Sequence, residues 1–487
     1  MFSTGTYARL PPHFYSRVDP TRVASPRLIK FNAKLAADLG LEARHAGPAE
    51  LAEIFSGNRL LPESQPIAMA YAGHQFGQFV PQLGDGRAIL LGEALDRTGR
   101  RRDVQLKGSG RTPYSRSGDG RAAIGPVLRE YVVSEAMNSL GLPTTRALAA
   151  VATGEIVFRE QPLPGAILTR VASSHVRVGT FQYFAARGDV DSVRRLAEYS
   201  MERHYPEAAL AANPHLELLR CAVQAQARLV AGWMAVGFIH GVMNTDNMAI
   251  SGETIDFGPC AFMDGYDSAA VFSSIDRMGR YAFANQPAAA QWNLARLAET
   301  LLPLIDADSR RSVELATDVV EGFAGEFAAC WLAGMRRKLG LFTEEGGDLE
   351  LAQAFLDLMQ HSAADFTLTF RRLCAAAEGE SGDAALESGF AEPSGIRGWA
   401  KAWRERLARE PQPASEHAAF MRMVNPWVIP RNHRIESVIA AAERGDFAPF
   451  EDLSQALASP YEERCETAPY SNPPRPDERV TRTFCGT

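Results

Sequence analysis

The chain has 487 residues, of which 46% are hydrophobic and 22% charged, and its formal net charge is −7. These proportions are typical of a folded globular protein and exclude wholesale disorder, while the length predicts two lobes or domains. An acidic balance without a basic stripe argues against nucleic acid as a partner. The most apolar stretch, residues 229–239, is too short to cross a bilayer, and the N-terminus lacks the apolar core of a signal peptide. We therefore expect a cytoplasmic protein without membrane contact.

The first 171 residues divide into an arm and a β-rich region. Residues 1–70 are expected to form a proline-punctuated arm with one short helix at 28–39. From 71 to 171, short apolar runs alternate with glycines, which is typical of a small, mostly antiparallel sheet. The segment 125–141 instead has apolar residues at helical spacing and ends on a glycine, so a helix interrupts the strands. The expected strands are 88–95, 103–108, 147–152, 155–160 and 166–171.

Beyond about residue 190 the pattern is helical nearly throughout, and from about residue 460 the chain has the composition of an extended, mobile tail. A small β-rich part with one key helix, followed by a large helical body, predicts an α+β, bilobal, protein-kinase-like fold. The expected division is an arm at 1–70, an N-lobe at 71–171, a helical C-lobe at 172–459 and a tail at 460–487. Six cysteines are scattered without CxxC spacing, which argues against a zinc knuckle or a disulfide scaffold.

The segment HGVMNTDNMAISGETIDFG at 240–258 has the spacing of a kinase-like catalytic segment. His240 and Asn247 are seven residues apart, as in His-x-Asp-x4-Asn, and Asp256 opens an Asp-Phe-Gly motif nine residues after Asn247. Mg²⁺ prefers hard oxygen ligands, so an Asn amide and an Asp carboxylate are suited to bridge it to phosphate oxygens. The spacing therefore predicts a metal and phosphate site at Asn247 and Asp256.

Val242 breaks this pattern, because it stands where a kinase has the aspartate that accepts the proton of the substrate hydroxyl. A valine cannot act as a base. Asp246 is the nearest carboxylate that could replace the missing base, although an aspartate at this place could instead cap the loop.

Basic side chains of the β-rich region are expected to face the phosphates. Lys107 ends the predicted strand run DVQLK, and it is the candidate for the lysine that pairs with a helix glutamate. Glu130 is the first candidate for that glutamate and Glu135 is its competitor, although either could be a solvated residue. Arg170 and Arg177 add positive charge near the lobe junction. Together with Lys107 they could clamp a triphosphate, although a single arginine is more often part of a surface ion pair.

Two glycine-rich runs could cover or hold phosphates. LGDGRAILLGE at 83–93 is a glycine turn, either a phosphate-covering loop or an ordinary hairpin turn. RSGDGRAAIGP at 116–126 leads into the predicted helix, so its amide groups could meet an anion at the helix N-terminus.

Five longer segments of the chain are distinctive: YAGHQFGQFVPQLGDGRA, QLKGSGRTPYSRSGDGRAA, TRVASSHVRVGTFQYFA, HGVMNTDNMAISGETIDFGPCAFMD and NPWVIPRNHRIE. They resemble the selenoprotein O family of pseudokinases, and the similarity covers nearly the whole chain. It implies a protein adenylyltransferase that binds ATP in reversed orientation in a kinase-like cleft and passes AMP to Ser, Thr or Tyr hydroxyls of protein substrates. The missing kinase base and the extra basic residues agree with such a reversal.

The resemblance also implies roles for single residues. Asn247 and Asp256 would hold Mg²⁺ or Mn²⁺, and Asp246 would accept the proton. The residues implied to contact the nucleotide are Gly84, Gly86, Arg87, Lys107, Asp119, Gly120, Arg170, Arg177 and Asp256.

The family often carries a redox-linked cysteine or selenocysteine near its C-terminus, and Cys485 stands at that place. The loop after the Asp-Phe-Gly motif offers Cys260 but otherwise has Ser273 and Ser274, so a disulfide between tail and loop is not expected.

Two other functions stay open at the level of the sequence. A conventional phosphotransferase is disfavoured by Val242. A non-catalytic ATP-binding scaffold is disfavoured because Lys107, Asn247 and Asp256 are all retained, and a scaffold needs no complete metal site.

Overall fold

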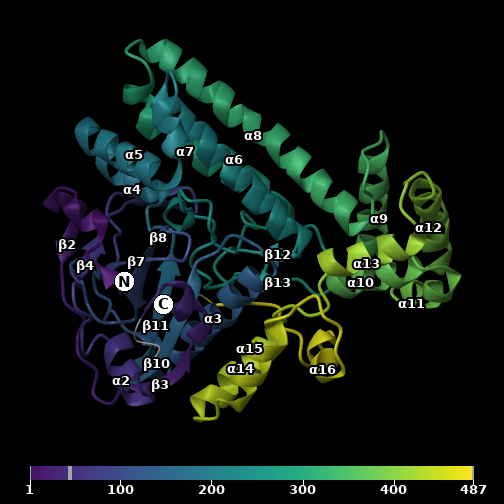
Figure 1. Ribbon diagram of the computed structural model, residues 1–487, viewed down its shortest axis with the longest axis horizontal. Helices are drawn as coiled ribbons and strands as arrows, with labels where there is room; N and C mark the ends of the chain where they lie inside the picture. The colour runs from purple at the N-terminus through teal and green to yellow at the C-terminus, as the bar shows by residue number, and fades with distance from the viewer. Residues whose placement is uncertain (1, 42–45, 485–487) are drawn as a thin grey trace.

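The computed structural model describes residues 2–41 and 46–484, and the protein is of the α+β class. Figure 1 shows a β-rich part at one end, long helices that run away from it, and a further group of helices at the opposite end. In the part of the chain that is described, no helix combines the length and the apolar character that a bilayer crossing requires.

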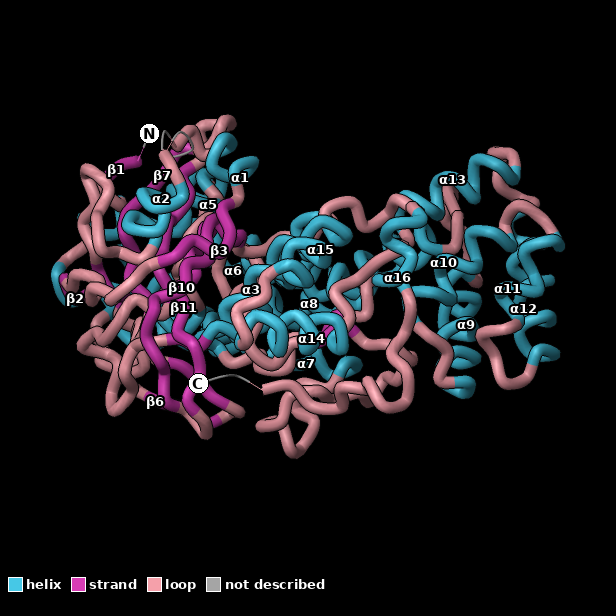
Figure 2. Tube along the Cα trace, turned by 90° about the horizontal axis from the view of Figure 1, so that it is seen from below, coloured by secondary structure: helices cyan, strands magenta, loops and turns pink. Residues whose placement is uncertain are grey.

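Within the described residues, nine strands form one antiparallel sheet, which lies at one end of the molecule in Figure 2. They are β1 (Phe2–Ser3), β2 (Tyr15–Arg17), β3 (Arg27–Phe31), β4 (Ile67–Met69), β7 (Ala88–Leu95), β8 (Arg101–Lys107), β9 (Ala122–Ala123), β10 (Arg146–Phe158) and β11 (Pro162–Ala172). Seven of them follow the order β2-β4-β7-β8-β11-β10-β3, while β1 pairs with β7 and β9 with β11. Two short pairs stand apart, β5 (Gly73–Gln75) with β6 (Gln78–Val80) and β12 (Phe238–Ile239) with β13 (Ala261–Phe262).

The register of the central strands brings two predicted basic residues together. Lys107 in β8 lies opposite Leu168 in β11, and Arg170 lies opposite Gln105. Side chains alternate between the two faces of a strand, so Lys107 and Arg170 project from the same face as diagonal neighbours. Strand pairing, and not proximity in the sequence, therefore makes this pair.

Helix α3 (Ile124–Ser139) is buried on nearly every side. It contacts β10 and β11 of the sheet as well as two C-terminal helices, α14 (Asn432–Glu443) and α15 (Ala448–Leu457). A helix covered from several directions needs apolar residues all round, and Val127, Leu128 and Met137 are each at most 2% exposed. The C-terminal helices thus hold α3 in position against the sheet.

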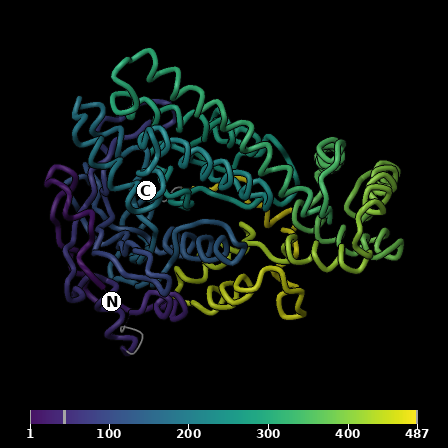
Figure 3. Tube along the Cα trace, turned by 45° about the horizontal axis from the view of Figure 1, so that its top comes forward, coloured from purple at the N-terminus to yellow at the C-terminus, as the bar shows by residue number. Residues whose placement is uncertain are grey.

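The helical part contains two groups. Helices α6, α7 and α8 pack on one another, whereas Figure 3 shows α9 to α13, in green to yellow-green, as a group set apart. This second group has its own core around Phe355, Phe370 and Trp403. The remaining helices are α1 (Ala33–Asp38), α2 (Pro48–Phe55), α4 (Val178–Ala185), α5 (Val190–His204), α6 (Pro214–Ala235), α7 (Gln286–Ile305), α8 (Ser309–Lys338), α9 (Asp348–Ser362), α10 (Phe366–Ala376), α11 (Asp383–Glu387), α12 (Pro393–Leu407), α13 (Ala414–Val424) and α16 (Ala468–Ser471). Short 3₁₀ helices cover Thr6–Arg9, Pro12–Phe14, Pro206–Leu210, Thr245–Asn247, Phe283–Asn285, Glu380–Gly382 and Cys465–Thr467.

The helix expected at 28–39 is wrong in its first half. Residues Arg27–Phe31 form β3, which pairs with β10, and only Ala33–Asp38 is helical. Asn32 separates the two elements, and its side chain accepts a hydrogen bond from the Leu35 amide as an N-cap. A short apolar run fits either period, and the distant strand β10 decides in favour of a strand. Residues of the expected arm therefore add strands to the sheet.

Residues 146–158 form one strand instead of the two expected at 147–152 and 155–160. β10 runs through both predicted runs, and its register with β11 shifts between Ala152 and Ile156. Gly154, inside this shift, has a φ of 74° in the left-handed region. The glycine therefore marks a bulge within a continuous strand and not a turn between two strands.

The segment after residue 460 is expected to be an extended, mobile tail, and the structure places part of it against the body of the protein, although most of its side chains are half-buried or exposed. The segment contains a 3₁₀ turn and α16, and Thr483 forms a parallel bridge with Ser273. The Thr483 hydroxyl also donates to the carbonyl of Pro259. The tail thus lies against the loop that follows the Asp-Phe-Gly motif. Cys485 lies outside the described residues.

Candidate active site

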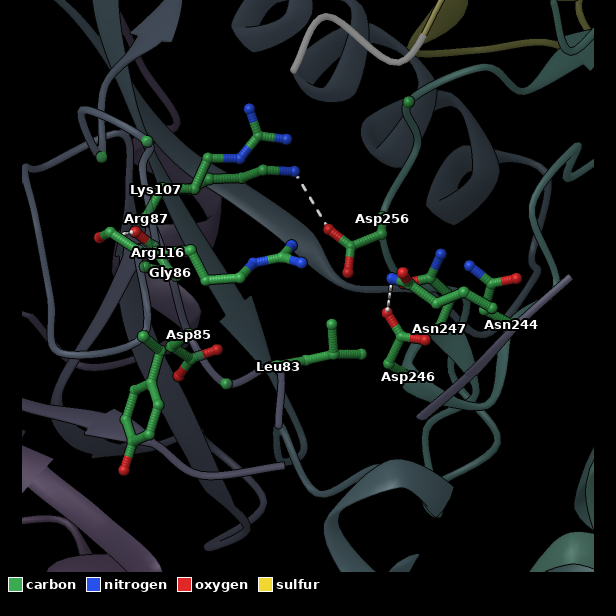
Figure 4. Close-up of a pocket in the computed structure, with 18 of the residues that line it drawn as sticks. Leu83, Asp85, Gly86, Arg87, Lys107, Arg116, Asn244, Asp246, Asn247 and Asp256 are labelled. Carbon is green, nitrogen blue, oxygen red and sulfur yellow. Dashed lines mark hydrogen bonds and ion pairs between the residues drawn. The ribbon is translucent and has the colours of Figure 1, made fainter. Parts of the chain in front are cut away.

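A cleft of about 760 Å³ opens between the sheet and the loop 240–258, and this volume lies within the range of small-molecule sites. Figure 4 shows Lys107 reaching toward Asp256 across this space, with Asp246 and Asn247 on the wall formed by the loop. Glu130 does not line the cleft but accepts a hydrogen bond from Lys107, which does. The predicted residues that line the cleft are Gly84, Gly86, Arg87, Lys107, Asp119, Gly120, Arg170, Arg177, Asp246, Asn247 and Asp256.

His240 holds the loop that carries these carboxylates. Its buried ring donates from Nε2 to the carbonyl of Ile255 at 2.9 Å and accepts at Nδ1 from the amide of Val242 at 3.4 Å. These bonds need a neutral imidazole with its proton on Nε2, and burial lowers the pKa of His240 accordingly. His240 therefore ties the start of the loop to the residue before Asp256.

Asp256 lies at the centre of a buried ion cluster. Lys107 Nζ lies 2.6 Å from Glu130 Oε2 and 3.1 Å from Asp256 Oδ1. Arg170 bridges the same two carboxylates. Burial by itself would raise the pKa of Asp256, but Arg170, Lys107 and Arg177 hold it well below its usual range. Asp256 is therefore ionised at neutral pH.

Glu135, the competing partner for Lys107, pairs elsewhere. Its carboxylate accepts from Nε and Nη2 of Arg146, both at 2.8 Å, and from the Asn32 side chain at 2.8 Å. It therefore joins α3 to β10 and to the start of α1, while Glu130, on another side of α3, faces Lys107.

Arg177 is enclosed at the N-terminus of α4. Its guanidinium carbon lies 4.5 Å from the centre of the Tyr71 ring, and its terminal nitrogens lie 3.8 Å from both Asp85 and Asp256. Its Nε finds no hydrogen-bond acceptor among the residues described. A buried guanidinium in the cleft wall with an uncommitted donor is suited to an anionic ligand.

Asp246 combines burial with incomplete hydrogen bonding. Its Oδ2 accepts from Gln75 at 3.4 Å, whereas Oδ1 has no partner within the described chain. Burial raises the pKa of Asp246 to about 6, although the Arg177 charge acts in the opposite direction. A Cβ at Gly73 would come within 2.7 Å of Oδ1, so a glycine is needed beside it. A carboxylate with a raised pKa and a free oxygen in a cleft has the properties of a general base.

The β5–β6 hairpin fixes the position of this loop. The amide of His74 donates to Thr245 Oγ1 at 2.7 Å, and the amide of Phe76 donates to Asn244 Oδ1 at 3.0 Å. With the bond from Gln75 to Asp246, the hairpin binds Asn244, Thr245 and Asp246 of the loop. These bonds limit how far Asp246 can move.

The oxygen atoms near Asp256 suit a divalent cation. Asn247 donates its Nδ2 to the carbonyl of Val242 at 3.0 Å, which leaves its amide oxygen available, and Asp256 supplies a carboxylate in the same cleft. These are the hard ligands that Mg²⁺ and Mn²⁺ take. Among the described residues no group of three or more His, Cys, Asp and Glu side chains could hold a metal alone. A bound ion would therefore depend on phosphate or water oxygens as well, as Mg²⁺ commonly does.

Two glycines of the cleft are required by geometry. Gly84 has a φ of 82°, and a Cβ there would lie 2.3 Å from the Tyr114 ring. Gly120 has a φ of 71°, and a Cβ there would lie 2.1 Å from the carbonyl oxygen of Gly110. The neighbouring Asp119 binds Arg159 at 2.9 Å. The run 116–121 lines the cleft, but the N-terminus of α3 does not.

The chain is similar to known proteins over nearly its whole length. Residues 1–458 match the family described as protein adenylyltransferase SelO. The chain is 63% identical over 483 residues to the protein nucleotidyltransferase YdiU of Rhizobium rhizogenes, covering 99% of this chain and 96% of the relative. It is 63% identical over 484 residues to the YdiU of Rhizobium meliloti and 61% over 483 to that of Bradyrhizobium sp. BTAi1, covering 99% of this chain and 98% of each relative.

The chain belongs to the SelO family. Membership makes it a nucleotidyltransferase, and the adenylyl group in the family description implies ATP as its substrate.

Some residues of the SelO cleft were missed by sequence reasoning. Asp85 is buried, accepts from the Met69 amide at 3.1 Å, and has its pKa raised by burial despite Arg177. The sequence did contain an indication, since Asp85 stands between Gly84 and Gly86 in the run that was interpreted as a phosphate-covering loop or a hairpin turn. Gln75 and Tyr71 also line the cleft, and no local spacing in the sequence indicates that they do.

Cys260, which lies next to the SelO cleft, does not have the lowered thiol pKa of a reactive cysteine. Cys260 is buried, donates to the carbonyl of Phe257 at 3.5 Å, and burial raises the pKa of its thiol to about 12. It is therefore a thiol and not a thiolate at neutral pH.

Proposed function

We propose that this SelO-family chain transfers AMP from ATP to Ser, Thr or Tyr hydroxyls of protein substrates. The family description and the printed names of the relatives support a protein acceptor. The observation that carries the proposal is the exchange of roles in the loop: Val242 stands in the cleft wall where a kinase has its base, and Asp246 offers a free carboxylate oxygen.

A reversed orientation of ATP is the second part of the proposal. Its support is the charge of the inner cleft wall, where Arg170 and Arg177 are each only 2% exposed and Lys107 lies beside them. Buried cations attract phosphates, whereas a neutral adenine ring offers them no negative charge. The triphosphate therefore points inward in this proposal, and the α-phosphate faces the loop.

The proposed step balances as follows. The acceptor hydroxyl oxygen attacks the α-phosphorus, its proton passes to Asp246, and the bond from the α-phosphorus to the β-bridging oxygen breaks so that pyrophosphate leaves. Lys107 and Arg177 offset the charge of the leaving pyrophosphate. Asn247 and Asp256 would hold Mg²⁺ or Mn²⁺, which supplies positive charge against the phosphates.

We also infer a kinase-like bilobal arrangement around this site. Residues 71–171 would form the core of the N-lobe, residues 1–70 would extend its sheet, and 172–459 would form the C-lobe. The pairing of Lys107 in β8 with Glu130 in α3, opposite the loop 240–258, supports this arrangement.

ATP labelled separately at the α- and γ-phosphates tests the proposal. We expect α-label on the acceptor protein, together with one added AMP by mass spectrometry. Val242→Asp should gain no γ-label transfer, because a restored base cannot bring a distant γ-phosphate to the acceptor. Transfer of γ-label by the wild type would establish a conventional phosphotransferase, and ATP binding without transfer of either label would establish a scaffold.

We expect Lys107→Ala to weaken ATP binding more than adenosine binding. A charge-assisted contact contributes about 1.5–3 kcal/mol, so the Kd for ATP should rise about 10- to 100-fold while that for adenosine stays within about twofold. Arg170 still pairs with Glu130 in this variant, so the fold should persist. Titration calorimetry with both ligands measures the difference, and equal losses for the two ligands would contradict the inward triphosphate.

A further inference from the structure

A surface next to the cleft has no role in the proposed step. It consists of the β5–β6 hairpin, the loop after the Asp-Phe-Gly motif and one side chain of α7. We call it the hairpin–loop surface and define it as Phe79, Ile275, Arg277, Met278, Arg280 and Trp292. The rings of Phe79 and Trp292 lie 5.0 and 5.1 Å from that of His74, and the Arg280 guanidinium lies 4.8 Å from Trp292. Ile275 also lines the cleft, so the surface begins at the cleft mouth.

The surface exposes apolar side chains that nothing in the described chain covers. Met278 is 92% exposed, Ile275 49% and Phe79 39%. Apolar side chains gathered on one surface and rimmed by charge are typical of protein contact sites.

Its two arginines have no ion-pair partner in the described ranges 2–41 and 46–484. Arg277 is exposed, while Arg280 stacks on Trp292 and its buried Nε has no acceptor. The adjacent Asp276 is turned inward, where its two oxygens accept from the amides of Arg280 and Tyr281 at 2.9 and 2.8 Å. The whole chain carries a net charge of −7, so this positive charge is a local feature of the surface.

The surface is also tied to the proposed base. The hydroxyl of Tyr281 donates to Asn244 Oδ1 at 2.9 Å, and the same oxygen accepts from the amide of Phe76 in the hairpin. Gln75 of that hairpin reaches Asp246. A segment bound on the surface would thus stand at a fixed place relative to Asp246.

We propose that the hairpin–loop surface docks the acceptor polypeptide and selects a segment with acidic side chains and one large apolar side chain near the modified hydroxyl. Arg277 and Arg280 pair with the acidic groups, and Met278 and Phe79 cover the apolar one. This inference rests on the proposed function, since it assigns the surface to the acceptor of the same site.

Direct binding of two fluorescent peptides tests the inference without relying on AMP transfer. Both peptides carry one serine and one leucine, and they differ only in having Asp and Glu or Asn and Gln at the flanking positions. Anisotropy is measured with the wild type, Arg277→Glu, Met278→Ser and the control Arg444→Glu, which reverses one exposed charge at the end of α14. Arg277 and Met278 are exposed and outside the cleft lining, so both variants should fold and bind ATP normally.

We expect the wild type and Arg444→Glu to bind the acidic peptide at least about fivefold more tightly than the neutral one. Arg277→Glu should abolish that preference, and Met278→Ser should weaken both peptides about equally. Equal binding of both peptides by the wild type, or a preference that survives Arg277→Glu, would overturn the inference. Transfer of α-label to the same serine, measured alongside, reports separately on the proposed function.

Discussion

Replacing Asp256 by asparagine should reduce AMP transfer by about 10³-fold or more. The substitution keeps the size of the side chain but removes the charge that would hold a divalent cation, and the loss of metal assistance in the transition state is worth several kcal/mol, roughly 4 for a 10³-fold effect. Initial rates with α-labelled ATP measure the change. The matched control is Asp318→Asn, which makes the same substitution at an exposed position in α8.

Asp256→Asn should also change the thermal stability of the protein, both without and with ATP. Asp256 compensates Lys107, Arg170 and Arg177 in the absence of nucleotide, so its neutral replacement leaves these cations short of negative charge. We expect a lower Tm for the free protein and a larger rise in Tm on adding ATP than in the wild type, because the triphosphate restores the missing charge. Wild-type transfer rates, or an unchanged Tm in both states, would contradict the role given to Asp256.

Asp246→Asn should lower AMP transfer by about 10²–10⁴-fold while leaving ATP affinity within about threefold. Loss of a positioned proton acceptor typically costs this much in rate, and Asp246 makes no contact with the cations that would bind the triphosphate. Single-turnover transfer of α-label and calorimetric ATP titration separate the two effects. Full transfer by this variant would mean that another group accepts the proton.

The pH dependence follows from the raised pKa of Asp246. The proposed base works only when ionised, so the wild-type rate should rise with pH, reach half its maximum near the pKa of about 6 and level off above it. The residual rate of Asp246→Asn should lack this step. A profile that is flat from pH 5 to 8 in the wild type would exclude Asp246 as the base.

The thermal stability of Asp246→Asn shows whether its loss of activity comes from misfolding. A carboxyl whose pKa is raised in the folded state binds its proton more tightly there than in the unfolded chain. It therefore stabilises the fold below its unfolded pKa, near 3.8, and this stabilisation is lost as the pH rises through about 6. Asp246→Asn cannot ionise, so at pH 8 we expect it to be at least as stable as the wild type. A marked fall in Tm would mean that the rate loss reflects structure and not chemistry.

The chemistry-bearing segments were predictable because their signals are local. The spacing from His240 through Asn247 to Asp256 places two oxygen ligands near one another within a single loop, whatever surrounds it. The helical period of 125–141 and its closing glycine located α3 to within two residues at its C-terminal end. Motif spacing and helical period involve residues that are close together in the sequence, so the sequence shows them directly.

The other features of the fold and of the site depend on contacts between segments that are far apart in the sequence. The choice between Glu130 and Glu135 depends on which side of α3 faces β8, and the run at 28–39 became partly a strand because β10 offered it a pairing edge. The partnerless oxygen and the raised pKa of Asp246 follow from its burial in the folded protein. The sequence by itself therefore determined which residue types stand at the reacting positions, and the tertiary structure decided their partners and charges, because burial and pairing arise between segments far apart in the chain.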